Sequence, residues 1–267
     1  MRFCGGALMG QQFWNGFRNL GATQSPVGML NGKLHLDATG IRVSLCKIVP
    51  LRHPKEDRLE SPHFNNLLQF VAQEKRYNNE LKIAKEEFEK FAGAIFETDR
   101  SYDARINSFH NWYILDRPLQ GRRKTPLEYF LEYNANSLSK KELINYQELK
   151  DNIHSLFELV KIPRGKTLVR DLATGKKYEI ADSTQTDYMD KGALFNSRIF
   201  RHDGAYYFSN YFLLHPAAVW KQVKKQARRV RKAKEDSTPF LFLLVLFQSR
   251  FDQYKQMEPA KIYRFDP

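Results

Sequence analysis

Residues 155–215 alternate apolar and polar side chains in short segments that are separated by turn-forming residues. A period of two is typical of strands with one buried and one exposed face. The pattern predicts five short strands, at residues 156–162, 167–171, 177–181, 193–200 and 205–212. Their spacing indicates a small antiparallel β module that forms a partly closed barrel, because closure removes exposed strand edges.

The clearest hairpin signal in the chain is Asp203-Gly204, which lies between the last two predicted strands. Tight hairpin turns need positive φ angles, and aspartate and glycine tolerate them. We therefore expect these two strands to pair directly.

Helical periodicity dominates the residues before the β module. Apolar side chains recur every three or four positions between residues 61 and 95, which predicts one long helix that starts at Ser61-Pro62. Sustained heptads are lacking, so the sequence favours packing on its own domain over a coiled-coil partner surface. The apolar face consists of Leu67, Phe70, Tyr77, Leu81, Ala84, Phe88, Phe91 and Ile95.

Three shorter helices are predicted to follow. Ile106, Phe109, Tyr113 and Ile114 form the apolar face of a helix over residues 102–115. Capping boxes at Thr125/Glu128 and Ser139/Glu142 then predict helices at about 125–134 and 140–153.

The C-terminal part predicts a helical pair. Residues 216–235 place Val219, Trp220, Val223, Ala227 and Val230 on one arc of a helix and basic residues on most of the rest. Residues 240–257 follow as a second helix that is apolar all round in its first half. Such a helix has to be buried, in its own core or against a partner.

These patterns together predict an α+β fold. We divide the chain into a poorly ordered or extended arm (1–58), a helical section (59–154), the β module (155–215) and a C-terminal helical pair (216–267). A hairpin is also expected within residues 34–45 of the arm, because Leu34, Leu36, Ile41, Val43 and Leu45 alternate around Ala38-Thr39-Gly40.

Charge adds the first functional indication. The formal net charge is +13, and residues 217–235 alone carry eight basic residues against one acid, Glu235. Such a balance favours polyanionic partners. With only Cys4 and Cys46 the sequence predicts neither a disulfide framework nor a cysteine zinc site. No apolar run has the ~20 residues that a transmembrane helix needs, so a cytoplasmic location is expected.

Several motifs resemble a known family. They are Phe109-His110-Asn111-Trp112, Thr125-Pro126-Leu127-Glu128, Leu156-Phe157-Glu158-Leu159 and Arg170-Asp171-Leu172 with Gly175. Over residues 105–212 the chain resembles uncharacterised bacterial proteins related to the domain that accompanies SEC-C zinc motifs. The resemblance implies helices that precede a small β module with an Asp-Leu-x-x-Gly turn. The zinc motif itself is absent from this chain, and the family has no established activity to transfer.

Signatures of catalysis and of cofactor binding are missing. The seven histidines are scattered without a metal-binding helix pattern, and there is no P-loop, dinucleotide fingerprint or nucleophile elbow. His110 near Asp116 suits a general base less well than a structural role. Asp182, Asp187, Asp190 and Asp203 have the positions of solvated turn residues rather than of metal ligands. We expect no cofactor, no metal and a non-catalytic role, with an enzyme as the third alternative, because catalytic residues are distant in sequence in most folds.

The expected function is that of a basic adaptor that binds RNA or DNA non-specifically through phosphate contacts. Tyr207 and Tyr211 would stack on unpaired bases from one face of the last strand, although a Tyr-rich sheet packed under helices is the more usual arrangement. The alternative is a protein-interaction or scaffold module that uses the long helix or residues 240–247. The predicted nucleic-acid-binding residues are Lys221, Lys224, Lys225, Arg228, Arg229, Arg231, Lys232, Arg122, Arg123, Lys124, Tyr207 and Tyr211.

Overall fold

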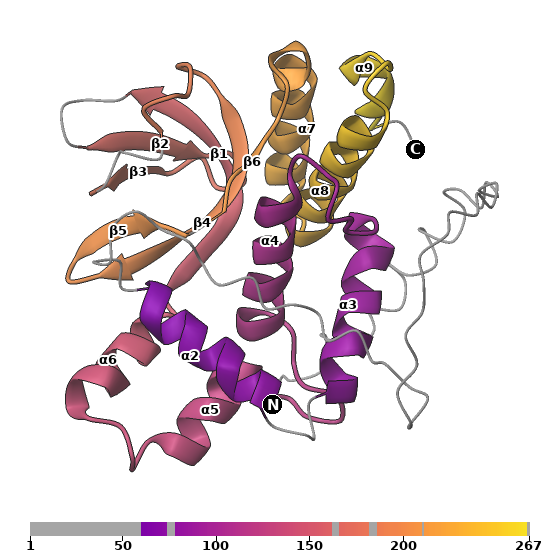
Figure 1. Cartoon of the computed structure of the whole chain (residues 1–267). Coiled ribbons are helices and arrows are strands. Elements are labelled where there is room, and N and C mark those ends of the chain that lie inside the picture. The colour runs from indigo at the N-terminus through magenta and orange to yellow at the C-terminus, as the bar shows by residue number, and fades with distance from the viewer. Residues whose placement is uncertain (1–59, 74–77, 162–165, 182–185, 210, 266–267) are drawn as a thin grey trace, which may run out of the picture. The chain divides into compact units, whose positions relative to one another are not determined.

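A computed structural model describes residues 60–73, 78–161, 166–181, 186–209 and 211–265 (Figure 1). The predicted arm and its hairpin at residues 34–45 lie outside these described residues. The five N-terminal helices are α2 (Glu60–Gln73), α3 (Asn78–Ala92), α4 (Tyr102–Leu115), α5 (Pro126–Asn134) and α6 (Lys140–Glu148).

The apolar pattern that predicted one long helix belongs to two helices with different partners. α2 packs against α4 and α5, whereas α3 packs against α4 and the C-terminal helix α8 (Thr238–Gln253). Leu67 of α2 and Phe88 of α3 both have no exposed surface. The prediction of a single helix is therefore wrong, but the prediction that its apolar face packs inside the same domain is confirmed.

Local capping signals set the starts of α5 and α6. The Thr125 hydroxyl accepts from the backbone N–H of Glu128, and the Glu128 carboxylate accepts from the backbone N–H of Thr125. Ser139 and Glu142 repeat this reciprocal arrangement. The hydrogen bond from Thr125 is the main reason that the pKa of Glu128 lies below its usual value. Both capping boxes are confirmed.

The β module contains six strands rather than the predicted five. They are β1 (Asn152–Lys161), β2 (Thr167–Asp171), β3 (Lys177–Ile180), β4 (Leu194–His202), β5 (Ala205–Phe208) and β6 (Leu213–Leu214). β1 starts four residues before the predicted strand, because residues 152–158 pair along β4. The helix predicted to reach residue 153 ends at Glu148 for the same reason.

Hydrogen bonds run in a ring through β1, β2, β3, β5 and β4, and back to β1. All pairings are antiparallel except a parallel contact between β3 and β5 at Ile180 and Tyr206. The ring is not a true barrel. Asp203 and Gly204 take φ angles of 47° and 78° between β4 and β5, as the hairpin signal predicted.

The C-terminal part contains a short 3-10 helix η2 (Ala217–Val219), then α7 (Trp220–Ala233), α8 and α9 (Pro259–Ile262). Figure 1 shows α7 and α8 beside the sheet. Phe240, Leu241, Phe242, Leu244, Val245 and Phe247 of α8 are all buried. The apolar first half of α8 therefore lies in the protein's own core. Among the described residues no helix is long and apolar enough to cross a bilayer.

Three apolar clusters hold these elements together. The first joins the N-terminal helices to Phe242 and Val245 of α8. The second lies between α7, α8 and α9 and includes Leu156 and Leu194 from the sheet. The third lies within the ring of strands, around Phe157 and Phe195. Alternation along β1 places Leu156 in the second cluster and Phe157 in the third.

Candidate functional site

The basic helix α7 is attached to the molecule by a narrow apolar arc. Val223, Ala227 and Val230 are spaced four and three residues apart and are buried in the cluster that α7 shares with α8. Trp220 fixes the first turn, because its ring N–H donates to the carbonyl of His215 at 2.8 Å. The helix ends at Lys234, which takes a left-handed conformation.

Five of the predicted phosphate-binding residues lie on the solvent face of α7. They are Lys221, Lys225, Arg228, Arg229 and Lys232. None of them forms an ion pair with a carboxylate of the described residues. At a rise of 1.5 Å per residue they span about 16 Å along the helix. We call this set the α7 stripe.

Lys224 and Arg231 do not belong to the stripe, although the sequence grouped them with it. The Lys224 ammonium lies 2.8 Å from the Glu158 carboxylate on β1. The Arg231 guanidinium lies against the turn between β2 and β3, where Nη1 is 2.9 Å from the position of a Cβ on Gly175. Both side chains are half-buried, and both connect α7 to the sheet.

Two lysines outside the predicted binding set follow this turn directly. Lys176 and Lys177 are exposed, and neither forms an ion pair with a described carboxylate. They come after Gly175, which contacts Arg231. Nothing in the sequence connects this turn to a helix more than fifty positions later, so only the tertiary structure reveals the connection.

The predicted secondary patch lies elsewhere and is partly occupied. Its segment, just before α5, lies at the opposite end of the view from α7 in Figure 1. The Arg122 guanidinium lies 4.7 Å from the ring centroid of Tyr129, and Lys124 pairs with Glu132 at 2.7 Å. Arg123 is exposed. The structure does not combine these residues with the α7 stripe.

The two predicted stacking tyrosines have different environments. Tyr211 is only 2% exposed and belongs to the core beneath the N-terminal helices, so its ring cannot stack on a base. β5 ends at Phe208, and the alternation of strand faces therefore does not extend to Tyr211. Tyr207 is half-buried, with its ring centroid 6.3 Å from that of His202.

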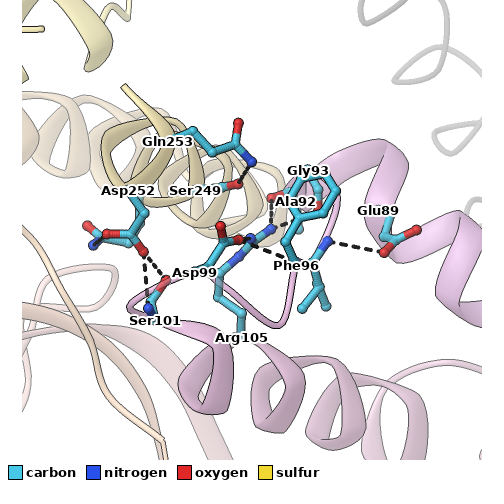
Figure 2. A network of polar contacts seen from close by, with 12 residues as sticks. Glu89, Ala92, Gly93, Phe96, Asp99, Ser101, Arg105, Ser249, Asp252 and Gln253 are labelled. Carbon is cyan, nitrogen blue, oxygen red and sulfur yellow. Dashed lines mark hydrogen bonds and ion pairs between the residues drawn. The ribbon is translucent and has the colours of Figure 1, made fainter. Parts of the chain in front are cut away.

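Arg105 at the start of α4 is the centre of a polar network that joins three helices (Figure 2). Its side chain is fully buried, donates to Asp99 at 2.7 Å and donates to the carbonyls of Ala92 and Gly93 at the end of α3. Nearby, Asp252 of α8 accepts from the backbone N–H of Ser101. Burial lowers the pKa of Arg105, and the Asp99 carboxylate opposes that shift. The network joins helix ends, and its central guanidinium has no exposed surface.

The buried histidines also have structural environments. His110, the sequence's candidate for a general base, is 2% exposed, and burial lowers its pKa to about 4. His215 is 3% exposed, and its ring nitrogens lie 2.9 Å from the Tyr263 hydroxyl and 3.1 Å from Asn196 Oδ1. Neither ring can reach a substrate in solvent.

One group of potential metal ligands lies among the described residues: Glu148, His202 and Asp203. His202 Nδ1 is 2.5 Å from the Glu148 carboxylate, and Nε2 is 3.4 Å from that of Asp203. With a carboxylate facing each ring nitrogen, the histidine connects the β4–β5 hairpin to the end of α6. Of the other turn aspartates, Asp187 and Asp190 are exposed, and Asp182 lies outside the described residues.

Comparison with known proteins finds a family model that matches most of the chain. The model of a family of unknown function (DUF7986) matches residues 66–248, which run from α2 into α8 and include every strand and all of α7. Neither the curated proteins nor the solved structures contain a match.

Proposed function

The chain belongs to a family of unknown function, DUF7986, and we propose that it acts as a non-catalytic basic adaptor that binds nucleic acid, alone or in an RNA-containing assembly, through phosphate contacts. The observation that carries the proposal is the α7 stripe. Five exposed cations on one helix lack partner carboxylates among the described residues. An array of unpaired cations attracts a polyanion and releases its condensed counterions when it binds.

The attachment of α7 favours a nucleic acid over a membrane surface. An amphipathic helix that lies in a membrane inserts its apolar face between the lipids. The apolar face of α7 is instead buried against α8, and Lys224 and Arg231 fix the helix to the sheet. Only the charged face is presented to a ligand, so electrostatic contact is the remaining mode of binding.

The surfaces suggested for a scaffold function are packed inside the protein. The apolar half of α8 is buried, and Ala84, Phe88 and Ala92 of α3 belong to the core. The exposed large apolar side chains of the described residues, such as Phe96 and Tyr254, are distributed over several elements. No observation favours the scaffold alternative over the α7 stripe.

Two further proposals accompany the adaptor function. We infer that the family is related to the domain that accompanies SEC-C zinc motifs, on the strength of the motifs around Trp112 and Asp171. In support, Asp171 accepts hydrogen bonds from the backbone N–H groups of Ala173 and Thr174, which is a local reason for an Asp-Leu-x-x-Gly turn. We also propose a cytoplasmic location, where nucleic acid is accessible.

The experiment is fluorescence anisotropy with labelled duplex and single-stranded nucleic acid over a salt series. The test variant replaces Lys221, Lys225, Arg228 and Arg229 with Ala. The control variant replaces Lys82, Lys90, Lys140 and Lys141 with Ala. These lysines are exposed on other helices, and their substitution removes the same charge. We expect the slope of log affinity against log salt to become shallower by about 3 to 4 in the test variant only.

Three outcomes would contradict the proposal. They are no binding at low salt, equal losses in the test and control variants, and tighter binding to vesicles that contain phosphatidylserine than to either nucleic acid. Circular dichroism of each variant checks that the helices are intact.

A further inference from the structure

The positively charged surface extends beyond α7 to the turn between β2 and β3. Arg231 contacts Gly175 at this turn, and the exposed Lys176 and Lys177 follow it. Lys177 is the first residue of β3, and its backbone position is fixed by pairing with Arg170 of β2. The two lysines are therefore held beside the C-terminal half of the α7 stripe by rigid elements.

The described part of this extended surface has no fully exposed ring on which a base can stack. Among the described residues of α7 and of the β2–β3 turn, no aromatic side chain is exposed. Trp220 packs against the apolar clusters, and Tyr178 packs edge-to-face on Tyr206 with ring centroids 5.0 Å apart. Sites for single strands combine a basic groove with exposed aromatic rings, and stacking contributes about 1–3 kcal/mol per base.

The glutamine amides of α7, which could read adenine, are engaged or half-buried. The Gln222 amide donates to the carbonyl of Tyr263 at 3.1 Å, and Gln226 is half-buried. Asparagine and glutamine amides are typical readers of adenine in the major groove. The available groups on this surface are flexible cations, which match phosphates of any sequence.

We infer, on the basis of the proposed function, that the ligand is a nucleic-acid duplex, bound by the α7 stripe together with Lys176 and Lys177. A duplex presents its phosphates outward and needs no aromatic ring for its stacked bases. A single strand would leave its bases in water on this surface. The two lysines add a second line of phosphate contacts beside the helix.

The test measures the salt dependence of binding to a duplex and to a single strand of equal length. The variant Lys176→Ala/Lys177→Ala removes the contacts at the turn, and Lys140→Ala/Lys141→Ala on α6 removes the same charge elsewhere. We expect the affinity for the duplex to be at least about tenfold higher than the affinity for the single strand. The slope for the duplex should become shallower by about 2 in the first variant and stay unchanged in the control.

Two results would overturn this inference and leave the proposed function intact. One is that the single strand binds at least as tightly as the duplex, while substitution of the α7 stripe still weakens binding. The other is an equal slope for the Lys176/Lys177 variant and the wild type. If substitution of the α7 stripe did not change the binding of nucleic acid, the proposed function would be overturned, and this inference with it.

Discussion

Arg105 illustrates how a single buried charge stabilises several helix ends. Its guanidinium donates to Asp99, to the carbonyl of Ala92 at the end of α3 and to the carbonyl of Gly93, the next residue. Arg105 itself lies in the first turn of α4. Carbonyls at the end of a helix have no partner within the helix. A buried cation at that point supplies hydrogen bonds and also complements the helix dipole.

Replacement of Arg105 by Met is expected to lower the free energy of unfolding by about 3 kcal/mol. The change leaves Asp99, whose side chain is 7% exposed, without its partner, and it leaves two carbonyls unsatisfied. Arg100→Met is the control, because Arg100 is exposed and no ion pair of Arg100 occurs among the described residues; its effect should stay within about 0.5 kcal/mol. Urea unfolding measures both, and similar values would disprove the role of the network.

Among the elements, α7 has cations of two kinds: some contact the sheet and the others are exposed to solvent. Adjacent residues of the same type have opposite positions: Lys224 pairs with Glu158, and Lys225 is exposed. Helical periodicity correctly predicted the apolar arc of Val223, Ala227 and Val230. It did not predict the pairing, because Glu158 is 66 positions away in the chain.

We predict opposite effects for the substitutions Lys224→Ala and Lys225→Ala. The first removes a partly exposed ion pair and should cost about 0.5–1 kcal/mol of stability, with little change in binding to a duplex. The second should leave stability within about 0.5 kcal/mol but make the salt slope of binding shallower by about 1. Thermal unfolding and anisotropy titrations of both variants test the pattern. Equal binding losses would show that Lys224 leaves Glu158 to contact the ligand.

In the molecule as a whole, as far as the structure describes it, α8 connects the first two apolar clusters. Phe242 and Val245 pack with the N-terminal helices, whereas Leu241 and Leu244 pack with α7 and the sheet. Three histidines have strongly lowered pKa values: His110 on α4, His154 on β1 and His215 beside α9. Their titration therefore affects both sides of the same structure.

Stability is expected to fall as the pH decreases below about 6.5. Burial lowers the pKa of His110 to about 4 and the pKa values of His154 and His215 to about 3, so the unfolded chain binds more protons than the folded protein in this range. Each residue should cost about 2 kcal/mol between about pH 7 and pH 5. Urea unfolding at several pH values measures this slope. His215→Gln should reduce the slope by roughly a third of the total contribution of the three residues, and an unchanged slope would contradict the assignment.

Features that depend on neighbours within a few residues were predictable from the amino-acid sequence. The capping boxes at Thr125 and Ser139, the Asp203-Gly204 turn and the apolar arc of α7 all form as predicted, because their contacts are local. The need to bury the first half of α8 followed from its composition alone. These features were enough to predict an α+β fold.

Contacts between residues from distant parts of the chain became visible in the folded molecule alone. It pairs β3 with β5, buries Tyr211, directs Lys224 and Arg231 to the sheet, and brings the turn before Lys176 to α7. Each of these outcomes depends on a contact between residues far apart in sequence. A periodic pattern shows which face of an element is buried, but it does not identify the element that covers that face.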